Sequence, residues 1–367
     1  MLKPYVLTAL LSLNFLTQAD ESPDACSPSQ YTRRASIRHI EGGGVGYNKG
    51  YSTLEAFIAA DPNLWSCTPF LDLRGHIFND GKVALNTGLG LRSILGSRVY
   101  GINSYFDFRN TNHRNYNQVG LGLETLGKLI DVRVNGYLPV GRKVSSPYDI
   151  GFNSFSGNSI LVNRKFQYAM KGVDGELGFH LGKASDFDFY GALGPYYFKG
   201  SEGKGALGGK VRLSGSFKEY VKVEVSDSFD NVFHNNVQGQ LTLSFPFGPK
   251  SKPKLKGRTN FANCDMATAI TSRMLQPVDR QEIVVVDSKT KVDPASNFVI
   301  FVDNQSNSLG TFESPYPTLL QAQTNSNPGD IIYVFPGDGT TTGMDSGIKK
   351  MTRNFGDQES LIHLQRT

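Results

Sequence analysis

Residues 82–92 read KVALNTGLGLR, and this stretch decides the fold. From Val83 to Leu91 every second residue is apolar or threonine, whereas the residues between them are polar, alanine or glycine. Such alternation places the two kinds of side chain on opposite faces of a β-strand. The same division recurs at 118–124, 221–226 and 237–247. The sequence therefore predicts an all-β protein.

Alternating segments continue from Arg38 to Phe247, separated by Gly, Asn, Asp, Ser and Pro. We place about twelve of them, an even number, as bacterial outer-membrane barrels have. The second could equally be a short helix. Residues 141–165, rich in Ser, Asn and Gly, are expected to form a loop between the seventh and eighth strands. The expected strands are 37–47, 51–59, 68–78, 81–92, 97–109, 116–127, 129–140, 166–182, 186–199, 206–217, 220–229 and 235–247.

Alternation alone does not say which face meets water, because a soluble sandwich hides its apolar face and a membrane barrel turns it to lipid. Charges of both signs share the polar face with glycines, as a crowded lumen requires, and aromatic residues gather at strand ends, as in an interfacial girdle. We therefore predict a twelve-stranded antiparallel transmembrane β-barrel over residues 37–247. Its lumen-lining candidates are Asp72, Arg74, Asp107, Arg109, Glu124, Arg133, Asp174, Glu176, Asp188, Lys210 and Arg212.

The composition excludes several classes of protein. The chain has 40 glycines among 367 residues but no G-X-Y period, which excludes collagen, and its 11% aromatic content excludes a disordered chain. The longest apolar run is too short for a bundle of transmembrane helices. The net charge of +5 is spread along the chain, which argues against nucleic-acid binding. Three cysteines are too few and too scattered for a disulfide scaffold or a zinc site.

The first residues predict export. Residues 1–19 combine Lys3, a short apolar core and small residues before a cleavage point, as in a signal peptide. A buried first helix is the alternative. Residues 20–36 are then expected to form a short periplasmic segment before the barrel.

The character of the sequence changes after the barrel. We expect a linker over 248–296, whose first part is basic and contains prolines. This part is either a solvated tether or a positive strand that threads the lumen beside Glu124, Asp174, Glu176 and Asp188. The linker charges are Lys250, Lys252, Lys254, Lys256 and Arg258.

Four segments carry a resemblance to a known family: GVGYNKGY at 44–51, FLDLRGH at 70–76, GINSYFD at 101–107 and VNGYLPVG at 134–141. They resemble the inverse autotransporter β-domain, the outer-membrane translocator of intimin and invasin, in the version found in chlamydia-like bacteria. LQPVDRQEIV at 275–284 looks like the passage that follows the barrel in that family.

Residues 298–347 are similar to the first coil of a right-handed parallel β-helix, as in the pectin-lyase-like superfamily. Strands are expected at 298–303 and 329–336, with a short helix at 318–323 between them, and residues 348–367 are an aperiodic tail. Repeat folds need about three units to bury a continuous core. We therefore expect the β-helix segment to be a truncated passenger.

An even number of strands returns the chain to the periplasm after Phe247, so the C-terminal part would reach the surface only through the lumen. The resemblance accordingly implies an outer-membrane translocator and anchor that exports and displays its own C-terminal passenger at the cell surface, for adhesion or host contact. The implied partners are outer-membrane lipid, the barrel assembly machinery, periplasmic chaperones and a host or surface receptor, with no nucleic acid.

Candidate chemistry is sparse. The six histidines make no pair at metal-ligand spacing, so we expect no cofactor, no metal site, no catalytic residue and no enzymatic activity. The family's periplasmic peptidoglycan-binding module is not seen. Two alternatives stay open: an outer-membrane pore with an empty lumen, and the N-terminal fragment of a surface carbohydrate-active β-helix protein.

Overall fold

The computed structural model describes residues 30–254, 263–344, 352–356 and 359–363. The chain divides into two compact units. The barrel unit comprises Met1–Ser145 and Gln167–Asp287, and the second unit comprises Ser146–Phe166 and Ser288–Thr367. The expected signal peptide at 1–19 lies outside the described residues.

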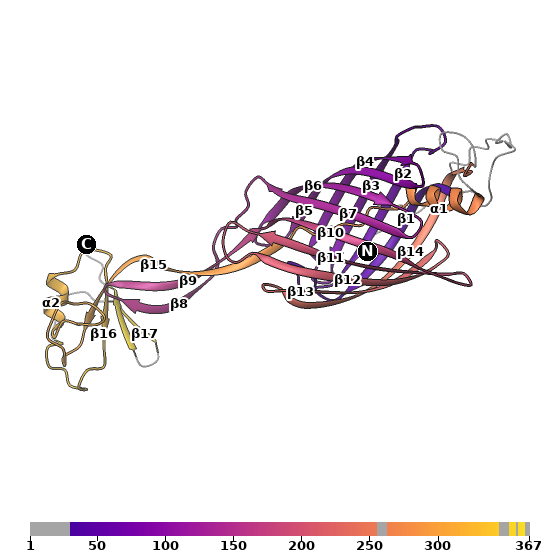
Figure 1. The fold of residues 1–367 in the computed structure, drawn as a ribbon. Coiled ribbons are helices and arrows are strands. Elements are labelled where there is room, and N and C mark those ends of the chain that lie inside the picture. The colour runs from indigo at the N-terminus through magenta and orange to yellow at the C-terminus, as the bar shows by residue number, and fades with distance from the viewer. Residues whose placement is uncertain (1–29, 255–262, 345–351, 357–358, 364–367) are drawn as a thin grey trace, which may run out of the picture. The chain divides into compact units, whose positions relative to one another are not determined.

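The barrel unit is a closed antiparallel barrel, with β1 paired to both β2 and β14 (Figure 1). Every strand thus has two neighbours, so no backbone edge is left unpaired, as a structure in lipid requires. The predicted fold class, a twelve-stranded antiparallel barrel, is confirmed. Its strands are β1 (Gln30–Glu41), β2 (Tyr51–Ala59), β3 (Thr68–Phe78), β4 (Val83–Leu95), β5 (Arg98–Asn110), β6 (Asn115–Leu126), β7 (Ile130–Val140), β10 (Lys171–Ala184), β11 (Phe187–Lys199), β12 (Ala206–Phe217), β13 (Val221–Asp230) and β14 (His234–Ser251).

The first strand begins earlier than its sequence pattern indicated. β1 starts at Gln30, so residues 30–36 belong to the barrel and not to a segment that precedes it. Thr32 and Ser36 face inward and are buried. Alternation was a weak indicator at this end of β1, because the outer face carries few large apolar side chains there. The strand is defined instead by its pairing with Phe245 and Phe247 of β14.

Residues 141–165 do not form the predicted loop. They contain β8 (Tyr148–Ser156) and most of β9 (Ser159–Ala169), which pair antiparallel and are joined by Gly157 and Asn158. Gly157 has φ +56°, which suits a tight hairpin turn. The register shifts between Tyr148 and Ile150 and again between Phe152 and Ser154. These irregularities break the period of two, which is why the pattern in the sequence did not identify the strands.

The outward face of the barrel is apolar and the inward face is charged. Leu89 and Leu121 are 62% and 63% exposed, whereas Asp72 and Asp107 are fully buried on the other face of the wall. A soluble protein would bury the leucines and expose the carboxylates. The arrangement is the one a barrel surrounded by lipid requires.

Leu121→Arg should destabilise the barrel, because Leu121 lies in the middle of β6 on the lipid-facing side. An arginine near the bilayer midplane costs about 2–4 kcal/mol, and the cost falls toward zero at the interfaces. Leu129→Arg is the matched control, because Leu129 is equally exposed, at 64%, but lies in the turn between β6 and β7. Urea unfolding of the barrel in lipid vesicles measures both variants. Equal, small effects of the two substitutions would contradict a lipid-facing position for Leu121.

The second unit contains a sheet in the order β17-β18-β16-β15-β9-β8. Its further elements are β15 (Val286–Val302), α2 (Leu319–Thr324), β16 (Ile331–Val334), β17 (Thr352–Gly356) and β18 (Glu359–His363). β15 and β16 are parallel, as one coil of a parallel β-helix would be, whereas β16 and β18 are antiparallel. β17 and β18 fall within 348–367, where the sequence indicated no pattern.

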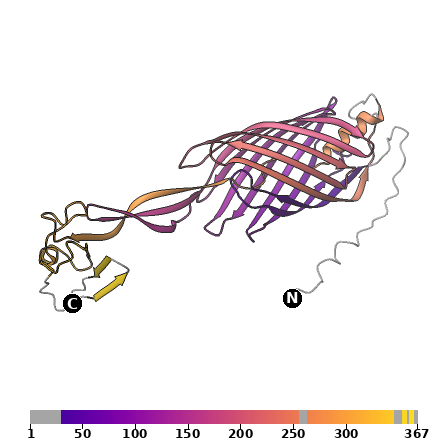
Figure 2. The same cartoon turned by 90° about the horizontal axis from the view of Figure 1, so that it is seen from below.

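One further helix, α1 (Cys264–Met274), follows the barrel strands. It belongs to the barrel unit and lies at one open end of the barrel, as the two views in Figures 1 and 2 agree. No helix within the described ranges is long and apolar enough to cross a bilayer.

Candidate functional site

The barrel has two ends that differ in what they carry. The α1 end carries α1 and the short turns from β4 to β5 and from β6 to β7. The insertion end carries the connection from β7 to β10, from which residues 146–166 depart. The chain between α1 and β15, together with α1 itself, contacts both ends, and we call residues 264–286 the plug.

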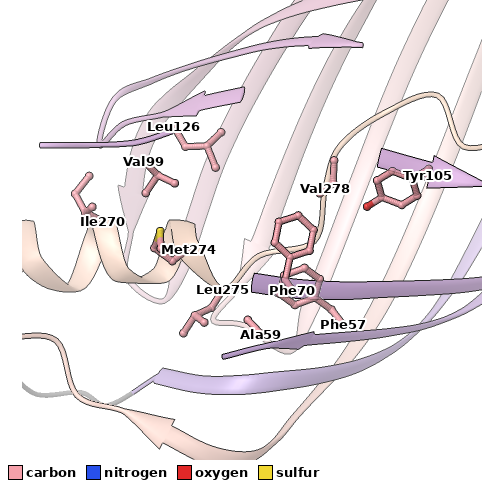
Figure 3. Close-up of a cluster of buried hydrophobic side chains, with 10 residues drawn as sticks. All are labelled: Phe57, Ala59, Phe70, Val99, Tyr105, Leu126, Ile270, Met274, Leu275 and Val278. Atoms are coloured by element: carbon pink, nitrogen blue, oxygen red, sulfur yellow. The ribbon is translucent and has the colours of Figure 1, made fainter. Parts of the chain in front are cut away.

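The plug begins with an apolar contact at the α1 end. Asn263 caps α1 by accepting a hydrogen bond from the backbone nitrogen of Met266 at 3.0 Å. Figure 3 shows the buried cluster that follows along the plug. It comprises Ile270, Met274, Leu275 and Val278 of the plug with Phe57, Ala59, Phe70, Val99, Tyr105 and Leu126 of the wall. Burial of these side chains holds the start of the plug against β2 to β6.

Arg280 is the central polar contact of the plug. Its two terminal nitrogens each donate to one oxygen of Asp107, both at 2.7 Å, and the two side chains are almost completely buried. The guanidinium also lies over the ring of Tyr105, 4.2 Å from its centroid. A Cβ added at Gly120 would lie 2.5 Å from the nearer guanidinium nitrogen. Glycine at this position of the wall therefore makes the space that Arg280 fills.

Two acidic residues of the plug meet arginines of the wall. Asp279 lies 3.3 Å from both Arg133 and Arg212. Glu282 accepts from Arg38 at 2.6 Å and from Arg74 at 3.0 Å. Tyr51 also donates to Glu282, at 2.6 Å. The charges of the plug are thus complementary to those of the wall.

The plug leaves the barrel at the insertion end. Ile283 packs in a buried cluster with Ile40 of β1 and Phe78 of β3, close to the ends of these strands. The backbone nitrogen of Met170 donates to the carbonyl of Val285 at 2.9 Å. The hydroxyl of Tyr168 donates to Asp287 at 2.5 Å. Residues 264–287 therefore pass through the lumen from the α1 end to the insertion end.

The structure places the predicted lumen-lining residues on the inner face of the wall. Arg74 pairs with Asp72 at 2.6 Å, and Arg212 pairs with Glu176 at 2.7 Å. Arg109 donates to the carbonyl of Val284 in the plug at 2.6 Å. Those that contact the plug or an oppositely charged wall residue are Asp72, Arg74, Asp107, Arg109, Glu124, Arg133, Glu176, Asp188 and Arg212. Those that line the space beside it also include Asp174, Asp188 and Lys210.

Several functional residues were missed by the sequence analysis. On the wall these are Arg38, Glu55, Arg92 and Glu224, which the alternation of their strands could have placed inward. On the plug they are Asp279, Arg280 and Glu282, in a segment without period. Their only indicator was the resemblance of residues 275–284 to a passage that follows the barrel.

The described basic residues of the linker, Lys250, Lys252 and Lys254, do not thread the lumen. Lys250 belongs to β14, is exposed, and places its ammonium 4.6 Å from the ring centroid of Tyr31. Lys252 and Lys254 follow directly after that strand, and Lys256 and Arg258 lie outside the described residues. A row of like charges would leave most of them unpaired in the lumen, whereas the plug brings charges of both signs that each find a partner.

A cavity remains beside the plug. It has a volume of about 400 Å³ and is lined by residues 276–282 of the plug, by Ser272 and Arg273 of α1, and by residues of β1 to β3, β7 and β10 to β14. Charged side chains of both signs face it, among them Glu176, Lys210, Lys222 and Glu224. The plug thus leaves a polar space in the lumen, although its charged residues also contact β1 and β12.

The histidines and cysteines are the remaining residues near this site that could bind a metal or form a disulfide. Within the described part of the chain, no group of His, Cys, Asp and Glu could hold a metal ion. His76 hydrogen-bonds to Thr53 at 2.8 Å and to Asn86 at 2.6 Å. Cys264 is disulfide-bonded, Cys67 is free and exposed, and Cys26 lies outside the described residues.

Several solved structures align with the chain at low identity. One comes from a study of the in-meso crystallization of membrane proteins, with 15% identity and a TM-score of 0.47, and covers 70% of this chain and 100% of that one. The KdgM porin aligns at 12% identity with a TM-score of 0.36, and the alignment covers 58% of this chain and 99% of the porin chain. The translocator domain of the autotransporter NalP from Neisseria meningitidis aligns at 11% identity with a TM-score of 0.28, covering 59% and 89%. No curated protein matches the chain.

A protein-family model covers part of the wall. Residues 58–151 match the model described as the inverse autotransporter β-domain. This part of the barrel wall is therefore similar to an inverse autotransporter β-domain. The matched residues run from the end of β2 to the start of β8 and include Asp107, Tyr105 and Gly120, which hold Arg280.

The resemblance found in the sequence is thereby confirmed. The inverse autotransporter β-domain lies in the bacterial outer membrane, and its function is that of an outer-membrane translocator or pore. Its wall holds the plug by complementary charges, and its polar space remains beside the plug.

Proposed function

We propose that the inverse autotransporter β-domain exports its own C-terminal part through the lumen and displays it at the cell surface, for adhesion or contact with a host. The observation that carries this proposal is the path of the plug, which enters at the α1 end and leaves at the insertion end. A chain that ends its last barrel strand at the α1 end reaches the opposite end only by such a path.

The lengths of the connections support the orientation. Outer-membrane barrels have short periplasmic turns and longer extracellular loops. At the α1 end, β4 to β5 and β6 to β7 are joined by residues 96–97 and 127–129. At the insertion end, β1 to β2 and β7 to β10 are joined by residues 42–50 and 141–170. The insertion end is therefore the end that we assign to the cell surface.

Protease added to intact cells should cleave within residues 288–344 and spare the barrel. An epitope tag placed after Gly343 should be accessible on intact cells, because the segment after the plug continues from the surface end. A tag between Gly96 and Ser97 is the matched control, and antibody should reach it only in broken cells. Protection of the first tag in intact cells would contradict the proposal.

A pore is the second candidate function, and the cavity beside the plug supports it. The space of about 400 Å³ is polar and lined by charges of both signs, as a water-filled path would be. A pore and a translocator make opposite predictions for the plug, because a pore conducts while the plug is in place.

A further inference from the structure

We propose that the hairpin of β8 and β9 is a docking template on which residues 298–335 of the same chain fold after they leave the barrel. This inference rests on the proposed export. It assigns a role to the segment between β7 and β10 that neither the barrel nor the plug requires.

The first argument is where the chain holds the hairpin. Its base is fixed within the barrel unit, because the nitrogen of Ala169 donates to the carbonyl of Lys143 at 2.9 Å, and that of Ser145 donates to the carbonyl of Gln167 at 2.8 Å. Tyr168 of β9 donates to Asp287, and Met170, which follows β9, donates to the carbonyl of Val285, where the plug ends. The plug therefore ends beside the base from which the hairpin departs.

The second argument is what the hairpin contributes to the core of the second unit. The ring of Phe155 lies 5.0 Å from that of Phe301, 5.2 Å from that of Tyr333 and 5.5 Å from that of Phe312. Phe155 and Ile160 pack against a buried cluster to which β15 and β16 contribute. The apolar core of the C-terminal segment is thus completed by side chains that belong to the barrel's own insertion.

The third argument is the backbone pairing at the tip of the hairpin. The nitrogen of Val299 donates to the carbonyl of Asn158 at 2.8 Å, and the side-chain amide of Asn158 donates to the carbonyls of Val299 and Gly310 at 2.7 and 2.8 Å. The nitrogen of Phe312 donates to the carbonyl of Gly157 at 2.9 Å. The two turn residues therefore bind two separate parts of the emerging chain, through their carbonyls and through the side-chain amide of Asn158.

Strand order gives the fourth argument. β15 lies between β9 and β16 in the sheet. Without the hairpin, β15 would be an edge strand with unpaired backbone groups and an uncovered Phe301. Addition of a strand to an existing edge is an established way to bind an extended peptide. Docking on the hairpin would also oppose backward movement of the segment through the lumen, because retreat would break the core.

The test uses the full chain in cells and the variants Phe155→Ala and Asn158→Ala. Ile150→Ala is the matched control, because Ile150 lies on β8 of the same hairpin and is 61% exposed. Heat-modifiable migration of the barrel in gels checks that each variant inserts. We then measure the rate at which added protease digests residues 288–344.

In both template variants we expect the C-terminal segment to reach the surface but to be digested at least about tenfold faster than in the unchanged protein. Phe155→Ala removes a core aromatic side chain. Asn158→Ala removes the two hydrogen bonds to the carbonyls of Val299 and Gly310. Ile150→Ala should behave like the unchanged protein. Pulse-labelled chains should also take longer to become resistant after they first become accessible.

Unchanged resistance in Phe155→Ala and Asn158→Ala, with the barrel inserted, would overturn the template. Equal loss in Ile150→Ala would do so as well, because it would make the effect one of the hairpin's general stability. The proposed export fails separately, if the C-terminal segment of the unchanged protein is inaccessible on intact cells. In that case the effect of Phe155→Ala on the protease resistance of residues 288–344 can still be measured in broken cells.

Discussion

Arg280→Ala should convert a nearly closed barrel into one that opens frequently. The substitution leaves the buried carboxylate of Asp107 without the arginine that neutralises it. Removing one partner of a buried ion pair costs about 3–5 kcal/mol, which lowers the equilibrium constant for docking of this part of the plug roughly a hundredfold to several thousandfold. The apolar contacts of α1 and the ion pairs of Glu282 remain, so we expect openings of the middle of the lumen and not loss of the whole plug.

Single-channel recording in planar bilayers measures this effect. Arg142→Ala is the control of equal charge change, because Arg142 is exposed in the connection after β7. Arg280→Gln with Asp107→Asn should restore much of the closed state, since neither side chain then carries an unpaired charge. A closed Arg280→Ala barrel, or openings that occur equally in Arg142→Ala, would show that the Arg280 pair does not hold the plug.

The barrel strands were predictable because two environments constrain each of them. Where lipid lies outside and a polar lumen inside, as for β3 around Leu73 and Arg74, every residue has to match its face, and the observed bounds of β3 equal the predicted ones. β1 has weaker apolar residues near Arg33 and was placed seven residues too late. Alternation therefore identifies only those parts of a strand whose lipid-facing residues are large and apolar.

The plug was not predictable in the same way, because its contacts are distant in sequence. Arg280 and Asp107 are 173 residues apart, and nothing in either strand or plug alone indicates that they meet. The five positive charges from Lys250 to Arg258 suggested that this segment threads the lumen. A lumen lined by charges of both signs instead stabilises a segment whose own charges can each form an ion pair. The excess of glycine on the lumen face was a relevant indicator. The absence of a side chain at Gly120 leaves the space that the guanidinium of Arg280 occupies.

The hairpin and the second unit were predicted least well for a related reason. Bulges near Asp149 and Asn153 remove the period of two from β8, so the sequence predicted a loop where the structure has a hairpin. The parallel pairing of β15 and β16 agrees with the β-helix resemblance, whereas β9 and β18 flank that pair in the sheet. The core around Phe301 depends on Phe155, 146 positions earlier in the numbering of the printed sequence.

Ending the chain after Lys254 should give the largest change in conductance of any variant. This truncation keeps β1 to β14 and their closing pair, and removes α1 and the plug. The lumen would then hold water along its full length, as in a porin. Ending the chain after Asp287 is the matched control, because it removes the C-terminal segment but keeps the plug and all of its wall contacts.

We expect the chain ended after Lys254 to conduct on the order of ten times more than the chain ended after Asp287, because conductance rises with the water-filled cross-section. Circular dichroism and heat-modifiable migration check that both barrels insert. The comparison also separates the two candidate functions. In a translocator the plug is the barrier, so the two truncations differ, whereas in a pore the space beside the plug already carries the current and the two conduct alike. Equal, high conductance would therefore reject the plugged translocator and favour the pore, since the cavity lined by Lys210 and Glu224 would then be the working channel.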